Sequence, residues 1–128
     1  MYFEHFALNV PDPRAMAEWY VEHCDLRVVH GIDVPPYMRF LADVTGRVIM
    51  EIYHNPKAPV PNYAEQSPLV VHVAYAVDDI EATKSELLDA GATLFSEEHQ
   101  DNGSVLVMLR DPWGIPLQLV KRGVPLGS

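Results

Sequence analysis

Two histidines, one glutamate and one glutamine are the side chains in this sequence best suited to hold a metal ion together. They are His5, Glu51, His72 and Gln118. Two imidazole nitrogens, a carboxylate and an amide oxygen form a donor set that can bind Zn²⁺, Ni²⁺, Co²⁺, Mn²⁺ or Fe²⁺ and leave room for water or substrate. With a single carboxylate, a bound divalent ion keeps a net positive charge and favours a substrate that develops negative charge. Glu51 is the member of this set expected to move a proton.

Alternation along four expected strands puts these residues on one side of a sheet. Side chains in a strand point to opposite faces in turn. The other face carries mostly large apolar residues: Phe6, Leu8 and Val10; Val48, Met50 and Ile52; Val71, Val73, Tyr75 and Val77; and Ile115, Leu117 and Leu119. A lone histidine on a strand is usually a hydrogen-bonded surface or core residue. A metal site is therefore favoured by the occurrence of all four candidate ligands at matching places in the two halves of the chain.

The two halves of the chain resemble each other at an offset of 67 residues. With His5 aligned to His72, residues 4–12 and 71–79 match at His, Ala, Val and Asp. A helical pattern follows each, beginning after Asp12 in one half and after Asp78 or Asp79 in the other. The remaining strands are expected at 26–31, 37–42 and 47–53, and at 92–97, 104–110 and 115–121. The order is βαβββ twice.

A proline-rich tract divides the repeats. Residues 54–68 hold four of the eleven prolines, which favours an extended linker between module 1, about 1–53, and module 2, 69–122. A module of about 55 residues with one helix buries too little surface to be stable alone. We therefore expect residues 1–128 to form a single domain in which both modules pack into one core.

The repeat carries a family resemblance. The openings at 4–12 and 72–79 and the ending at 111–119 resemble the vicinal oxygen chelate superfamily of glyoxalase I, bleomycin resistance proteins and extradiol dioxygenases, over about residues 2–122. The resemblance implies an α+β fold in which two βαβββ modules form an open, cup-shaped mixed β-sheet with helices on its outer face. It also implies that the metal ligands are His5, Glu51, His72 and Gln118.

The same resemblance implies a function. We expect a metal-dependent lyase or isomerase that binds a small vicinal-oxygen substrate through the metal and transfers a proton through Glu51. Relatives similar to bacterial glyoxalase I have glutamate where this chain has Gln118, so the glutathione-hemithioacetal reaction is less expected. The ligand set is similar to that of methylmalonyl-CoA epimerase, with the acid and amide in exchanged modules.

Two alternatives come from other branches of the family. An Fe²⁺ extradiol-type dioxygenase could use His5, His72 and Glu51 as its facial triad. A non-catalytic binding protein of the bleomycin-resistance kind could use an acidic cup to sequester a cationic ligand. Further residues are candidates to shape the substrate site in any of these: Tyr37, Arg39, Tyr53, Met108, Arg110 and Trp113.

Composition narrows the partners. Nine Lys and Arg against eighteen Asp and Glu give a net charge of −9, which disfavours nucleic acid. No apolar run approaches the roughly 20 residues of a membrane span, and the N-terminus does not read as a secretion signal. Cys24 is the single cysteine, so an intrachain disulfide is excluded. The expectation is a cytoplasmic protein with a small-molecule ligand, and the resemblance adds a possible homodimer.

Overall fold

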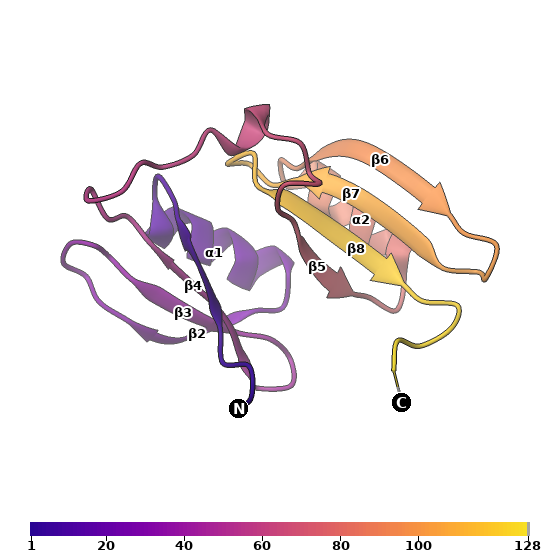
Figure 1. The fold of residues 1–128 in the computed structure, drawn as a ribbon, viewed down its shortest axis with the longest axis horizontal. Coiled ribbons are helices and arrows are strands. Elements are labelled where there is room, and N and C mark those ends of the chain that lie inside the picture. Colours follow the sequence, from indigo (N-terminus) through magenta and orange to yellow (C-terminus); the bar gives the residue numbers. More distant parts are fainter. Residues whose placement is uncertain (128) are drawn as a thin grey trace. The chain divides into compact units, whose positions relative to one another are not determined.

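The computed structural model describes residues 1–127 and shows the βαβββ order twice within that range (Figure 1). The first half contains β1 (Phe6–Asn9), α1 (Pro13–His23), β2 (Arg27–Gly31), β3 (Arg39–Ala42) and β4 (Val48–Tyr53). A 3-10 helix, η1 (Tyr63–Glu65), precedes β5 (Val73–Ala76), α2 (Ile80–Asp89), β6 (Thr93–His99), β7 (Val105–Arg110) and β8 (Pro116–Lys121). These elements confirm the α+β fold with two modules, and they form two compact units that meet in sequence at Pro61 and Asn62.

Each unit contains a four-stranded mixed sheet. The strand orders are β1-β4-β3-β2 and β5-β8-β7-β6, so the repeat extends to the topology. In each sheet the first strand of the module runs parallel to the last, and the other neighbours are antiparallel. The last strand of each module therefore lies in the interior of its sheet. Glu51 and Gln118 lie in these interior strands.

Both helices begin at the aspartates that the repeat aligns. Asp12 accepts a hydrogen bond from the Ala15 amide at 3.1 Å, and Asp79 accepts one from the Ala82 amide at 3.0 Å. A carboxylate at this position satisfies a backbone donor that has no partner within the helix. The structure thus selects Asp79, rather than Asp78, as the cap of α2.

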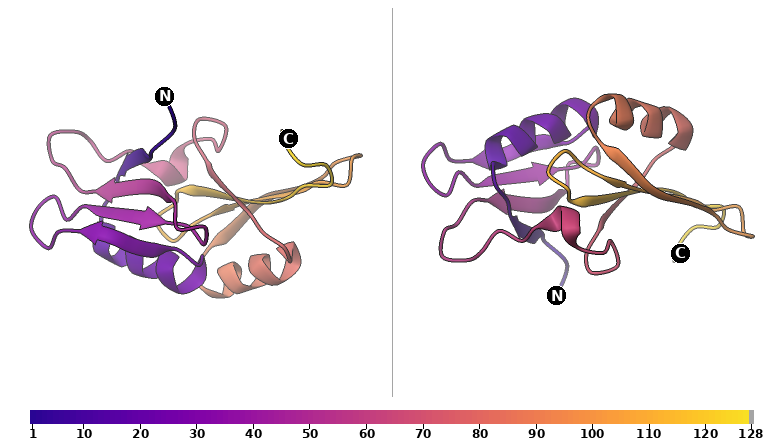
Figure 2. Two further views of the ribbon diagram at one scale, coloured as in Figure 1. Left: turned by 90° about the horizontal axis from the view of Figure 1, so that it is seen from below. Right: turned by 90° about the horizontal axis from the view of Figure 1, so that it is seen from above.

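One face of each sheet is covered by the helix of its own module (Figure 2). Helix α1 packs against β2, β3 and β4, and α2 packs against β7 and β8. The buried apolar residues of the first unit include Met16, Trp19, Tyr20, Leu41, Met50 and Ile52, and those of the second include Ile80, Leu87, Leu109, Leu117 and Leu119. Met50 and Ile52 of β4 and Leu117 and Leu119 of β8, which were expected on the apolar faces, lie on these buried faces. The expectation of one core shared by both modules stays a prediction.

Strand β4 contains one extra residue relative to β3. Leu41 lies opposite Met50, but the next residue, Ala42, lies opposite Val48, so Ile49 is accommodated as a β-bulge. Strict alternation along β4 is therefore wrong at Val48, because a bulge interrupts the period of two. It holds from Met50 to Tyr53, which includes Glu51. The matching ladder between β7 and β8 is regular from Val105 to Arg110.

The proline-rich tract 54–68 differs from the extended linker expected from its composition. Its first part is bound to the first unit, where the Asn9 side chain donates to the carbonyls of Asn55 and Ala58, both at 3.0 Å. In its second part, Tyr63–Glu65 forms η1. The Arg110 guanidinium holds this turn by donating to the carbonyls of Tyr63 at 2.9 Å and Gln66 at 2.7 Å.

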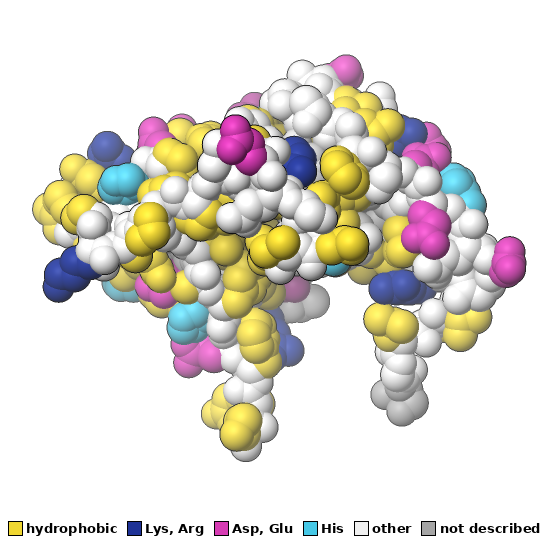
Figure 3. Space-filling view, turned by 45° about the horizontal axis from the view of Figure 1, so that its top comes forward, with side chains coloured by type: hydrophobic (Ala, Val, Ile, Leu, Met, Phe, Trp, Pro, Cys, Tyr) yellow, Lys and Arg dark blue, Asp and Glu magenta, His cyan; other side chains and the backbone are white. Residues whose placement is uncertain are grey.

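Figure 3 shows one face of the surface. Acidic side chains are scattered over this face rather than gathered in one patch, and apolar side chains lie between them. Within residues 1–127, no helix has the length and apolar character needed to cross a bilayer.

Candidate functional site

His5 and Glu51 are brought together in the first unit. His5 immediately precedes β1, and Glu51 lies in β4 opposite Ala7. Because His5 is two residues before Ala7, its side chain points to the same side of the sheet as Glu51. The Nε2 atom of His5 lies 3.5 Å from the Oε1 atom of Glu51, and the side chains are 28% and 20% exposed. This pair is half-buried but open to a ligand.

The geometry of this pair fits a shared metal ion. Two ligand atoms that are each about 2.1 Å from a tetrahedral ion lie about 3.4 Å apart. The other imidazole nitrogen, Nδ1, is 2.8 Å from the Oε1 atom of Glu4. An ionised carboxylate can only accept a hydrogen bond, so the neutral ring carries its proton on Nδ1 and presents the Nε2 lone pair toward Glu51.

His72 and Gln118 have the corresponding places in the second unit. His72 immediately precedes β5, and its Nδ1 donates a hydrogen bond to the Pro68 carbonyl at 2.9 Å. In the neutral ring this leaves Nε2 unprotonated and available to bind a metal ion. Gln118 lies in β8, opposite Ala74 of β5. His72 is two residues before Ala74, so His72 and Gln118 point to the same side of their sheet. His72 is exposed and Gln118 half-buried.

The four-ligand set itself stays a prediction. The structure brings His5 and Glu51 within 3.5 Å of each other, and it places His72 and Gln118 on one face of the second sheet. In the part of the chain from 1 to 127, no three His, Cys, Asp or Glu side chains form a group able to hold a metal ion. Each unit thus contributes a pair of candidate ligands.

Glu51 and Gln118 each lie in a row of side chains that crosses the sheet. The first row consists of Ala7, Glu51, Phe40 and His30, and the second row consists of Ala74, Gln118, Met108 and Ser96. In the first row, the Phe40 ring meets the His5 ring edge-on at 5.2 Å and stacks against His30 at 6.3 Å. The first row is charged and aromatic, whereas the second has no charge and no ring.

Glu4 and Phe40 are the contacts of His5 that the sequence analysis missed. The only feature of the sequence that could have indicated the contact with Glu4 was its position next to His5, a candidate metal ligand. For Phe40, the pairing with Glu51 depends on the bulge at Ile49, which the pattern of apolar residues does not reveal.

Two arginines proposed to shape the substrate site hold loops, and their role at the site stays a prediction. The Arg39 guanidinium donates to the Ile32 carbonyl at 2.6 Å and pairs with Asp33 at 2.7 Å. Arg110 donates to carbonyls of the linker and stacks on Phe95 at 5.4 Å. Of the other residues proposed with them, Met108 lies beside Gln118 in the second row.

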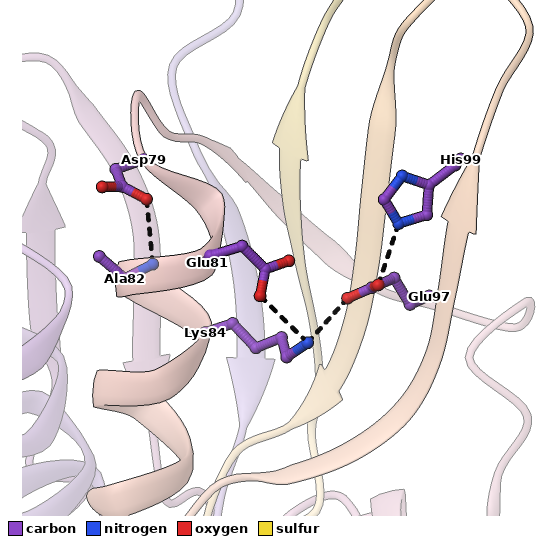
Figure 4. A network of polar contacts seen from close by, with 6 residues as sticks. All are labelled: Asp79, Glu81, Ala82, Lys84, Glu97 and His99. Carbon is purple, nitrogen blue, oxygen red and sulfur yellow. Dashed lines mark hydrogen bonds and ion pairs between the residues drawn. The ribbon is translucent and has the colours of Figure 1, made fainter.

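A separate polar network joins α2 to β6 (Figure 4). Lys84 bonds Glu97 at 2.9 Å, and the other oxygen of Glu97 lies 3.0 Å from the Nε2 atom of His99. The hydrogen bond with His99, followed by that with Lys84, lowers the pKa of Glu97. The hydrogen bond to Glu97 is the main cause that raises the pKa of Lys84. Glu97 pairs with Val107, whose side chain is buried, so this network lies on the helix-covered side of the second sheet.

Comparison with known proteins identifies the family. The profile of the Glyoxalase/Bleomycin resistance protein/Dioxygenase superfamily matches residues 2–119. This chain belongs to that superfamily. The superfamily includes both enzymes and non-catalytic binding proteins, and its members are often metal-dependent. The comparison with curated proteins found no match to this chain.

Solved structures show the same fold. A glyoxalase family protein from Enterococcus faecalis is 24% identical, with a TM-score of 0.70 over 94% of this chain and 97% of that chain. A glyoxalase family protein from Bacillus cereus is 16% identical, with a TM-score of 0.77 over 95% and 94%. TnmS3, an antibiotic binding protein from Streptomyces sp. CB03234, is 15% identical, with a TM-score of 0.68 over 95% and 96%. At these identities the likeness concerns the fold alone.

Proposed function

We propose that this superfamily member is a metal-dependent lyase or isomerase that acts on a small substrate with neighbouring oxygens. The observation that carries the proposal is the 3.5 Å separation between His5 Nε2 and Glu51 Oε1, with the other nitrogen of His5 bonded to Glu4. A histidine nitrogen free of its proton next to a carboxylate is an arrangement suited to binding a divalent cation. Membership of the superfamily supports the choice of reaction class.

Each ligand has a distinct part in the proposal. His5, Glu51, His72 and Gln118 would hold the ion, and neutral Gln118 cannot act as a base. A divalent ion bound there would polarise the oxygens of the substrate and acidify the adjacent C–H bond. Glu51 takes the proton from that carbon and returns it to the product, as a general base and then a general acid. Since the second row has no carboxylate, proton transfer belongs to the first unit.

Metal content is the first test. The full chain is purified without added metal, and its metal content and thermal unfolding are compared with those of the double variant His5→Ala, His72→Ala. We expect near-stoichiometric divalent metal in the wild type and stabilisation of about 2.7 kcal/mol at a free metal concentration 100 times the Kd. The double variant should lose both. No bound metal, and no stabilisation by Zn²⁺, Ni²⁺, Co²⁺, Mn²⁺ or Fe²⁺, would contradict the proposal.

Proton transfer is tested with Glu51→Gln. In D₂O, the metal-loaded wild type should exchange the C–H protons of small α-hydroxyketones, which NMR follows directly. The variant should exchange them at least about 100-fold more slowly, because general base catalysis contributes that much or more. Its amide oxygen can still bind the metal, so metal content serves as the control. Full exchange by Glu51→Gln with metal bound would exclude Glu51 as the base.

The same preparations separate the two alternatives. Oxygen uptake with a catechol that depends on Fe²⁺ would indicate an extradiol-type dioxygenase. Ligand binding without metal or turnover would indicate a binding protein.

A further inference from the structure

We propose that Glu4 is a positioning residue for His5, which it orients by accepting the Nδ1 proton. In the neutral ring, this bond makes Nε2 the unprotonated atom and aims its lone pair toward Glu51. The inference is about a residue outside the expected ligand set, and its consequence for metal binding rests on the proposed function. The orientation of His5 itself does not depend on any metal.

Three contacts define the orientation of the His5 ring. Glu4 lies 2.8 Å from Nδ1, Glu51 lies 3.5 Å from Nε2, and the Phe40 ring meets the imidazole edge-on, at 88° and 5.2 Å. The contact with Phe40 restricts the tilt of the ring. The Glu4 carboxylate faces Nδ1 of the His5 ring and the Glu51 carboxylate faces Nε2, and only Glu4 is within hydrogen-bond distance. Glu4 therefore decides which nitrogen carries the proton.

In the second unit, His72 also has a hydrogen-bond acceptor at Nδ1, but this acceptor is a backbone carbonyl. There the Nδ1 atom of His72 is satisfied by the Pro68 carbonyl at 2.9 Å. Both histidines at the repeated position thus have an acceptor at Nδ1, and the two acceptors are chemically unrelated. The shared result, an available Nε2, is what a metal-binding histidine requires.

Exposure explains why this role concerns orientation and not stability. The Glu4 side chain is 77% exposed, and solvent-exposed pairs of this kind add little to folding stability. Glu4→Ala should therefore fold as the wild type does. The remaining effect is on the proton position in His5 and, through it, on the affinity for metal.

The test reads the proton position directly. Long-range ¹H–¹⁵N NMR spectra of the metal-free full chain at about pH 8.5, well above the ordinary histidine pKa, distinguish Nδ1–H from Nε2–H rings. We expect Nδ1–H for His5 in the wild type and in Glu4→Gln, which keeps an acceptor oxygen, and a shift toward Nε2–H in Glu4→Ala. The His72 signal in the same spectra is the internal control and should not change. An unchanged His5 tautomer in Glu4→Ala would overturn the proposal.

Metal affinity gives the second readout. Zn²⁺ titrations should show a loss of about tenfold in Glu4→Ala, at the lower end of the effect of such partners because Glu4 is exposed. The matched control is Glu22→Ala, which removes an acid 76% exposed beside His23 and should not alter affinity. A tautomer shift without any change in Zn²⁺ affinity would overturn the positioning role toward metal. If the wild type binds no metal while the tautomer shifts, Glu4 still positions His5 and the proposed function fails.

Discussion

At the scale of single residues, Gly114 shows why a turn of the second unit requires glycine. Its φ is +84°, and a Cβ atom at this position would lie 2.7 Å from the Cβ of Ala64. Gly114→Ala should therefore lower the free energy of unfolding by about 2–3 kcal/mol, through both backbone strain and overlap. Urea unfolding measures the difference.

Gly103 provides the matched control for this substitution. Its φ is +87°, but a Cβ atom at this position would lie 3.7 Å from its nearest neighbour, the Cα of Gly123. Gly103→Ala should cost only the backbone strain, about 1 kcal/mol. Equal losses in the two variants would show that contact with Ala64 is unimportant.

Residue types and alternation were sufficient to predict that His5 and Glu51 share a face. They were insufficient for the groups that touch His5. The contact with Phe40 depends on cross-strand register, and the bond to Glu4 depends on side-chain rotamers, which composition and period do not determine. The sequence also could not show that the donors of Arg39 and Arg110 are engaged by loop carbonyls.

At the scale of elements, the cap of α2 makes a clear prediction. Asp79→Ala should lower the free energy of unfolding by about 1 kcal/mol, because the Ala82 amide loses its acceptor. Asp78→Ala is the control, since Asp78 is a neighbouring acid that does not cap the helix. The denaturant midpoint should fall in Asp79→Ala and change little in Asp78→Ala. A larger loss in Asp78→Ala would show that the cap is assigned to the wrong residue.

The contact between α2 and β6 predicts a dependence of stability on pH. Interactions with His99 and Lys84 lower the pKa of Glu97 from 4.5, so the folded state favours its ionised form. The resulting stabilisation is complete above that value and is lost as the pH falls through the lower pKa of the folded state. Unfolding free energies of wild type and Glu97→Gln should therefore differ near neutral pH and converge below about pH 4.5. A constant difference down to pH 3 would contradict this.

Elements were predicted well where their signals are local. Both helix starts follow from aspartates that precede apolar periodicity, and the eight strands follow from alternation and turn residues. The bulge in β4 and the 3-10 helix at Tyr63–Glu65 were missed. The bulge depends on the cross-strand register with β3. The 3-10 helix is held by the Arg110 guanidinium, which is 47 residues away from Tyr63 in the sequence.

At the scale of the whole molecule, all ladders of the two sheets close within one half of the chain. Fragments 1–61 and 62–128 should nevertheless fail to fold cooperatively alone, because a single helix on a four-stranded sheet buries little apolar surface in a chain of about 60 residues. Mixed together, they should recover a cooperative thermal transition. Independent, cooperative unfolding of each fragment would contradict the expectation of one shared core.

The bulge at Ile49 makes the two halves unequal in their tolerance of deletions. Loss of one residue just before Glu51 would convert a bulged ladder into a regular one, and Glu51 would remain opposite Phe40. The ladder of β7 and β8 contains no bulged residue that a deletion could remove. Loss of one residue just before Gln118 would turn its amide to the opposite face of the sheet, toward α2. A gene for this protein can therefore shorten by one codon before the acid without moving it, but not before the amide.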